Sequence, residues 1–467
     1  MKEGNAMAYE KIKDLLKSEK PWEYSFEKEC KASGYDGKDA LERYFIYKSI
    51  GSILKNVNLN YFELLKFDTF DRERKKHLIE EAHKSMCKSC PKYAAAADYG
   101  KENYFVYGNI ADCDGSGGDF DLALELYDML WDWKKNEDDT FGKIELFRCS
   151  CPENNCIKGQ FGGDTMNSVQ TVLGELVKHL AKEQGKEGEY NKTLKNPRAW
   201  YSSVLYCITL YRTFNTADKL PNFTSDLKNI PGLESYMELY HTLGNFVLVP
   251  AKFNGKRALP TADFWDSSLV WLKEEGFGSE KTFFSKDEFT KYINYFFLWD
   301  YIEAKEEGYK VNHLFSAHKY IEYGRSKDSL AWTNLSLTYK GLKNMNAYIK
   351  DNEAYEEYKK DVKDIEKNAK EFFETAAHHI RHRGIFITIL LLLKSEAENN
   401  DQISAFFDDP GEGIRSECFL NKVHQNGYQE VLNKIETLLP KLDESLETVK
   451  KIKDGITAFK DMDKQKD

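Results

Sequence analysis

The chain has 467 residues, a length that exceeds one ordinary hydrophobic core and predicts two or three domains or lobes. Hydrophobic residues make up 41% of the chain, which is enough for substantial cores, and the scarcity of proline favours helices. The 67 basic and 77 acidic residues leave a net charge of −10. This balance argues against a broad nucleic-acid-binding face, although it still permits a local basic groove.

Two features of the sequence predict a cytoplasmic protein with no membrane partner. The N-terminal segment is charged throughout and lacks the apolar core of a secretory signal peptide. The longest apolar run, near 384–393, covers only about half of a membrane span. In that compartment the nine cysteines are expected to be reduced rather than paired in disulfides.

Hydrophobic periodicity predicts a mainly α protein with short β elements, arranged as a multi-lobed helical protein. Several helices are expected before residue 100. Further helices are expected over 119–135, 169–182, 200–214, 231–243, 263–275, 286–304 and 352–379, the last interrupted at 381–384 and continued over 385–395. An amphipathic helix begins at 429. Strands are expected over 103–108, 143–149 and 246–250.

Two loops rich in glycine and aspartate, at 112–119 and 408–413, are candidate boundaries. We therefore expect an N-terminal helical region over 1–138, a central core over 139–398 and a C-terminal helical tail over 399–467.

A glycine-containing segment before the expected helix at 169 is a candidate anion-binding corner. Gly162 and Gly163 would let a ligand approach the main chain, and Asp164 or Thr165 would cap the first helical turn. Free N–H groups and partial positive charge at a helix start suit a phosphate. The segment matches no dinucleotide or Walker A motif, and an ordinary capped helix after a turn is the alternative.

The cysteines are the next candidates for chemistry. Cys87 and Cys90 have the spacing of a zinc knuckle, and Cys149, Cys151 and Cys156 follow about sixty residues later at irregular intervals. A structural zinc site is one interpretation. We favour the other, in which reduced thiols pack as small apolar groups.

Arg72 and His77 resemble the Arg/His motif of HEPN ribonucleases, which are helical RNA-cutting domains. The resemblance implies an arginine that holds phosphate and a histidine that transfers protons. A solvated face of a charge-rich helix explains the same residues.

Polar residues further along the chain lie in separate short segments between the expected apolar helices. His241 can act as a general acid or base, because its unperturbed pKa lies near neutrality, or it can be a core histidine. Asn245 and Arg257 lie on backbone expected to be irregular. Asp266 is either a half-buried partner of an arginine or a surface residue. Arg383 can grip a phosphate or form a salt bridge with a carboxylate, and we favour the salt bridge.

These elements in this order resemble a family of uncharacterised bacterial proteins. Gly163 to Ser168 reads Gly-Asp-Thr-Met-Asn-Ser, and His241 to Phe246 fits the family's His-x-x-Gly-Asn-Phe element. The resemblance covers about residues 145 to 395 and implies a shared core, a domain of unknown function. No activity comes with it.

The central core is therefore expected to gather one polar pocket for a nucleotide-like or other phosphorylated ligand. His241 and Asp266 are the candidate catalytic residues, and the candidate ligand-binding residues are Gly163, Asp164, Thr165, Asn167, Asn245, Arg257 and Arg383. A helical scaffold without catalysis and the HEPN-like ribonuclease remain the alternatives. The sequence identifies no cofactor beyond the zinc interpretation.

Overall fold

The computed structural model describes residues 12–23, 118–132, 161–165, 182–185, 231–239, 242–250, 265–273, 284, 286–305, 308–312, 314, 356, 360, 364–424 and 426–464. Within these segments the protein is mainly α-helical with two short β ribbons, as the sequence predicts.

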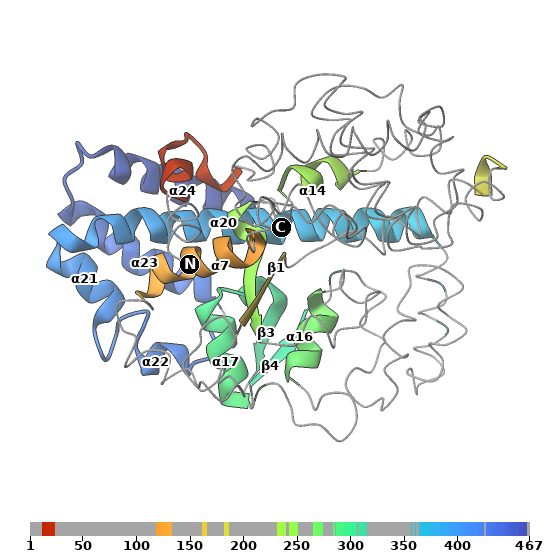
Figure 1. The fold of residues 1–467 in the computed structure, drawn as a ribbon, viewed down its shortest axis with the longest axis horizontal. Helices are drawn as coiled ribbons and strands as arrows, with labels where there is room; N and C mark the ends of the chain where they lie inside the picture. The colour runs from red at the N-terminus through yellow and green to blue at the C-terminus, as the bar shows by residue number, and fades with distance from the viewer. Residues whose placement is uncertain are drawn as a thin grey trace, which may run out of the picture.

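One long helix, α20 (Ile365–Ser395), is the centre of the described structure. It crosses the middle of the view in Figure 1, with α14 and α24 above it and the β ribbons below it. Asp364 caps its start by accepting a hydrogen bond of 3.0 Å from the main-chain N–H of Lys367. Apolar residues such as Phe372, Phe386 and Leu390 are fully buried, because α20 is packed by neighbours around its circumference.

Short elements from the first half of the chain pack on α20. They are the 3₁₀ turn η1 (Pro21–Glu23), helix α7 (Gly118–Trp131), helix α14 (Leu233–Leu239) and the 3₁₀ turn η7 (Leu243–Asn245). The closest approach joins η7 to α20, where Gly244 lies against Gly384. A Cβ at position 244 would lie 1.8 Å from the carbonyl oxygen of Ile380, so only glycine fits there.

A two-stranded ribbon contains the segment after η7, where residues 246–249 are buried. Strand β1 (Phe161–Thr165) pairs antiparallel with β2 (Phe246–Pro250), with Gly163 opposite Leu248. Buried side chains satisfy carbonyl groups of β2, since Tyr127 donates to Phe246 O at 3.0 Å and Tyr292 donates to Leu248 O at 2.9 Å. Main-chain groups buried away from water need such partners.

A second group of elements lies below α20 in Figure 1. It contains α16 (Trp265–Lys273), α17 (Lys286–Tyr295), the 3₁₀ turn η9 (Trp299–Tyr301) and an antiparallel ribbon of β3 (Ile302–Lys305) and β4 (Gly308–Val311). Helix α17 turns its aromatic face inward. Tyr292 contacts Phe289, Phe284 and Phe296, and Phe289 also stacks on Tyr309.

The last part of the chain returns to cover α20. It runs through η12 (Ala397–Asn399), α21 (Asp401–Asp408), α22 (Glu417–Leu420), α23 (Gly427–Leu438), η13 (Leu439–Lys441) and α24 (Glu447–Lys464). Helix α24 packs along α20 and buries Val449, Ile452, Ile456 and Phe459. The expected amphipathic helix from residue 429 is therefore confirmed as α23, and α24 adds a second helix to the tail.

The structure corrects two of the expected helices. The expected break at 381–384 is wrong, because α20 continues through Gly384, where the close contact with η7 stabilises a glycine that is locally unfavourable in a helix. The expected helix over 286–304 ends at Tyr295, because Phe297 adopts a φ of +54° and the chain turns into η9. The strand at 246–250 is confirmed with the expected bounds, and the helices expected at 119–135 and 263–275 are confirmed over the described residues Gly118–Trp131 and Trp265–Lys273.

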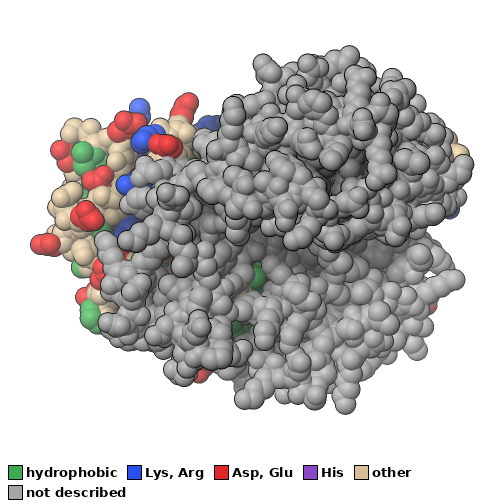
Figure 2. Space-filling view, viewed as in Figure 1, with side chains coloured by type: hydrophobic (Ala, Val, Ile, Leu, Met, Phe, Trp, Pro, Cys, Tyr) green, Lys and Arg blue, Asp and Glu red, His purple; other side chains and the backbone are tan. Residues whose placement is uncertain are grey.

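Among the described residues, no helix combines the length and the apolar character that crossing a bilayer requires. On the described part of the face in Figure 2, acidic and basic side chains are interspersed. Leu446 is the one large hydrophobic side chain that the described segments expose. The described helices thus offer no extended apolar patch for a partner.

Candidate metal centre

A cluster of two histidines and one aspartate is the strongest candidate site in the described part of the chain. Asp300 comes from η9, and His378 and His382 come from α20. Each offers one ligand atom, and the three atoms all lie within 4.8 Å of one another. His378 and His382 are four residues apart, so an unbroken helix places them on the same face. Their rings stack with centroids 5.3 Å apart.

The turn that presents Asp300 is held in an uncommon backbone conformation. Phe297 has a φ of +54°, which is costly for a large residue and persists only where neighbours enforce it. Arg383 donates from Nε to Phe296 O at 2.8 Å, and Tyr428 donates to Phe297 O at 2.7 Å. These two bonds fix the chain immediately before η9.

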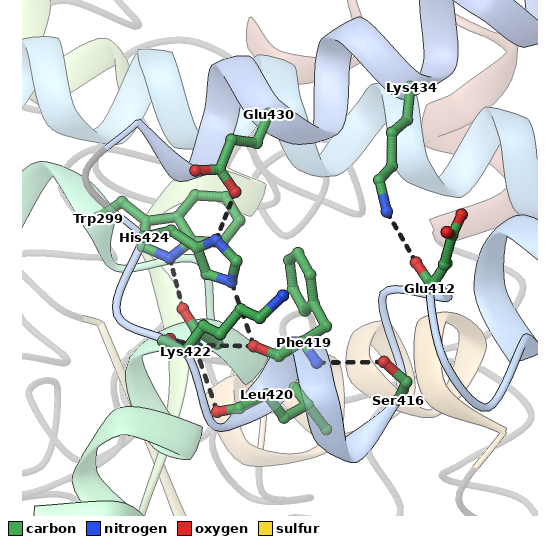
Figure 3. Close-up of polar contacts among 10 residues, drawn as sticks. Trp299, Glu412, Ser416, Phe419, Leu420, Lys422, His424, Glu430 and Lys434 are labelled. Carbon is green, nitrogen blue, oxygen red and sulfur yellow. Dashed lines mark hydrogen bonds and ion pairs between the residues drawn. The ribbon is translucent and has the colours of Figure 1, made fainter.

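Trp299 anchors the same turn from the other side. Its indole N–H donates to Asn294 Oδ1 at 2.7 Å, and its ring meets Tyr428 edge-on with centroids 4.8 Å apart. Figure 3 shows Trp299 beside His424, which lies between the Glu430 carboxylate at 2.5 Å and the Phe419 carbonyl at 3.1 Å. The backbone of Asp300 is therefore positioned by packing on both sides.

Helix α24 covers His382 from outside. Phe459 stacks on the imidazole with a centroid distance of 3.7 Å, and Asp463, one turn later, brings Oδ1 to 3.3 Å from His382 Nε2. This approach is an ion pair without the alignment of a hydrogen bond. On the inner side, Asp300 Oδ2 lies 2.8 Å from His382 Nδ1.

The cluster is half-buried, and two carboxylates lie close to the imidazole of His382. The side chains of His382 and Asp300 are 4% and 7% exposed, whereas that of Asp463 is 47% exposed. Burial lowers the pKa of His382, but Asp300 and then Asp463 outweigh it and raise the pKa to about 9. Burial raises the pKa of Tyr428, and Asp300 adds to this shift. A metal ion bound by His382 would have to displace its proton, because an imidazole binds a metal in its neutral form.

The segment expected to form an anion-binding corner has another structure. Gly162, Gly163 and Asp164 lie within strand β1, opposite Val249, Leu248 and Val247, and Thr165 pairs with Phe246. The expectation of a glycine turn at these residues is therefore wrong. Pairing with β2 already fixes this backbone, whereas the expected turn would have left it available to a ligand.

The structure gives Arg383 a different set of partners from those expected. Its fully buried guanidinium donates to the carbonyls of Phe296, Gly244 and Phe246 at 2.8, 2.7 and 3.0 Å, and also to Tyr127 Oη. The favoured salt bridge is thus replaced by bonds to main-chain oxygens. Each of the three nitrogen atoms is already used, so the side chain acts as an internal clamp.

The remaining candidates are only partly described. Asn245 is fully buried in η7, near the clamp, and is thus brought together with Arg383 and β1. Asp266 is fully buried and accepts a hydrogen bond of 3.2 Å from Leu314 N, so the surface alternative is wrong. His241, Asn167 and Arg257, the cysteines Cys87, Cys90, Cys149, Cys151 and Cys156, and the pair Arg72 and His77 lie outside the described residues.

Sequence reasoning missed all three members of the cluster. The signal for two of them was present, since His378 and His382 have the spacing of one helical turn. An expected helix end at 379 separated them. Asp300 gave no signal, because its aromatic neighbours suggested a continuing helix.

Comparisons with protein-family models, with curated proteins and with solved structures found no match to this chain. The resemblance to uncharacterised bacterial proteins stays a prediction. The candidate site thus depends on the geometry described above.

Proposed function

We propose that this protein binds a divalent first-row transition metal ion, such as Zn²⁺, through Asp300, His378 and His382. The observation that carries the proposal is the convergence of two imidazoles and one carboxylate within 4.8 Å at a half-buried place. Imidazole and carboxylate are common ligands of such ions, and three protein ligands are a frequent set.

Small movements would complete the coordination. Ligand atoms in a tetrahedral zinc site are about 3.4 Å apart, since each lies about 2.1 Å from the metal. The widest separation in the cluster is no more than 4.8 Å, so the side chains need to close by about 1 Å. His378 is partly buried, whereas the side chains of Asp300 and His382 are almost fully buried.

Supporting groups have the properties expected around a metal ion. The ordered turn at η9 fixes Asp300, and the stacked Phe459 restricts the ring of His382. Such outer groups orient ligands and strengthen metal binding.

Calorimetric titration of Zn²⁺ into the chelator-treated full chain tests the proposal. His378→Ala and Asp300→Asn should each remove one bound ion per chain, or weaken it at least about tenfold. His379→Phe is the matched control, because His379 is on the same helix but packs its ring against Tyr301. Any Zn²⁺ that the cysteines bind contributes equally in every variant, so the comparison between variants is unaffected. Equal stoichiometry and affinity in all four proteins would overturn the proposal.

The phosphorylated-ligand hypothesis stays a separate prediction. Arg383 donates to protein oxygens, so Arg257 would have to hold the phosphate. Thermal denaturation with ATP, with inorganic phosphate and without either, in the wild type and Arg257→Gln, checks it. Stabilisation of the wild type alone is the expected result.

The two alternatives have no specific observation in their favour. The scaffold hypothesis expects aromatic-rich helices to form an exposed surface, but α17 buries its rings. The ribonuclease hypothesis depends on His77, and RNA cleavage by His77→Ala against the wild type tests it directly.

A further inference from the structure

We propose that Asp463 is a positioning residue of the metal centre, which accepts the Nε2 proton of His382 and thereby makes Nδ1 the atom that binds the ion. This inference rests on the proposed function. Asp463 is not a ligand in it, because its carboxylate acts on the ion only through the imidazole.

The two carboxylates beside His382 lie at opposite nitrogens of its ring. Asp300 Oδ2 is 2.8 Å from Nδ1, and Asp463 Oδ1 is 3.3 Å from Nε2. The group of ligand atoms within 4.8 Å of one another contains Asp300 and His378 but not Asp463. Nδ1 is therefore the nitrogen on the side of the cluster, and Nε2 is the nitrogen on the side of α24.

The place of the ring proton follows from this arrangement. A neutral imidazole that binds a metal carries its one proton on the other nitrogen. With the ion on Nδ1, that proton is on Nε2 and is directed to Asp463, whose ionised carboxylate only accepts. A carboxylate at the second nitrogen is the usual group that selects which nitrogen of a histidine binds a metal.

Asp463 also selects the orientation of the ring. Phe459 and His378 stack on His382 with centroids 3.7 and 5.3 Å away, and Tyr428 meets it edge-on, so packing fixes the plane of the ring. A half-turn about the Cβ–Cγ bond keeps this plane but replaces both nitrogens with ring carbons. A hydrogen bond from Nε2 to Asp463 opposes that turn and keeps Nδ1 on the side of the cluster.

Helix α24 places the carboxylate of Asp463 beside the ring. Phe459 and Asp463 are four residues apart and share one face of α24, so the stacking of Phe459 on His382 brings Asp463 to Nε2. The side chain of Asp463 is 47% exposed, and a small rotation would align the hydrogen bond that the 3.3 Å ion pair lacks.

Zn²⁺ titration of the full chain with two substitutions at one position tests the inference. Asp463→Asn and Asp463→Ala both remove the negative charge, but only asparagine keeps an oxygen that accepts the Nε2 proton. Asp463→Asn should therefore bind Zn²⁺ about tenfold more tightly than Asp463→Ala. Asp461→Ala is the control and should bind like the wild type, since Asp461 is on the same helix but pairs with Lys464 at 2.9 Å.

Nuclear magnetic resonance of the chain labelled with ¹⁵N-histidine supplies a readout that an ion pair alone would not produce. The ring signals of His382 are those lost in His382→Gln. In the Zn²⁺-loaded wild type they should report a metal-bound Nδ1 and a protonated Nε2.

The outcomes separate this inference from the proposed function. If no Zn²⁺ binding depends on His378, both fail. If Zn²⁺ binds to Nε2 of His382, the three-ligand site stands and the role of Asp463 is refuted. Equal Zn²⁺ affinities of Asp463→Asn and Asp463→Ala would also refute it, because an ion pair depends on the charge that both substitutions remove.

Discussion

Gly244→Ala should destabilise the protein strongly, because two backbones meet at this residue. An added Cβ would lie 1.8 Å from the carbonyl oxygen of Ile380 and 2.8 Å from the amide nitrogen of Gly384. Both are main-chain atoms of α20, so no rotation of a side chain relieves the contact. Either η7 or α20 has to move.

The size of the effect combines two costs. Overpacking of a closed contact costs about 1–3 kcal/mol. Movement of η7 also breaks the 2.7 Å bond from Arg383 to Gly244 O, and a bond to a charged group contributes about 1.5–3 kcal/mol. We therefore expect a loss of at least about 3 kcal/mol. For cooperative unfolding of 467 residues, with an unfolding entropy of about 1 kcal/mol/K, this lowers the melting temperature by at least about 3 °C.

Gly384→Ala is the matched control at the same crossing. Its Cβ would lie 3.3 Å from Gly244 N and 3.6 Å from the Cβ of Trp22, so small shifts suffice. Alanine is about 1 kcal/mol more favourable than glycine inside a helix. The two contributions oppose each other, and the melting temperature should stay within about 1 °C of the wild type.

Thermal denaturation followed by far-ultraviolet circular dichroism measures both variants. The expected order is wild type and Gly384→Ala together, with Gly244→Ala well below them. A Gly244→Ala protein that melts within about 2 °C of the wild type would refute the close backbone contact. Equal destabilisation by both substitutions would contradict the prediction that position 244 has less space for a Cβ than position 384.

Three further perturbations test other parts of the structure. Arg383→Met should lower the free energy of unfolding by at least about 3 kcal/mol, because it leaves buried carbonyls without donors. Arg381→Gln on the same helix is the control and should change that free energy by less than about 0.5 kcal/mol. Urea denaturation measures both variants. Asp132→Ala should be less stable than Asp132→Asn by about 1 kcal/mol in the same assay, because asparagine tolerates the left-handed φ of 51° at this position; equal stabilities would contradict this. Gly427→Ala would place a Cβ 2.3 Å from the Trp299 ring and should weaken Zn²⁺ binding by displacing η9. An unchanged Zn²⁺ affinity in calorimetry would contradict the inference that Trp299 positions Asp300.

Local pattern was sufficient for elements whose sequence and packing agree. Phe246–Pro250 is a run of apolar and β-favouring residues, and it forms β2. The stripe of Trp265, Leu269 and Leu272 is fully buried in α16, as its helical spacing indicates. These signals depend only on neighbours within a few residues.

Local sequence patterns did not predict the elements that are fixed by contacts between residues far apart in the chain. Glycine at position 384 suggests a helix break, but the approach of Gly244 stabilises the helix there. The aromatic run at the end of α17 suggests a longer helix, but bonds from Arg383 and Tyr428 hold the turn at Phe297. The candidate metal centre depends on both corrections, because a continuous α20 aligns the histidines and the turn delivers Asp300.

The internal clamp at Arg383 has a consequence for how the chain assembles. Its guanidinium contacts partners that precede it by 87, 137, 139 and 256 residues. A lone buried charge is unfavourable, so α20 cannot settle in its final place before those segments arrive. Since contacts of large sequence separation slow folding, we expect a late, cooperative closing step. A fragment that begins after Tyr127 would lack one of the guanidinium's partners and should expose the charge to water rather than fold around it.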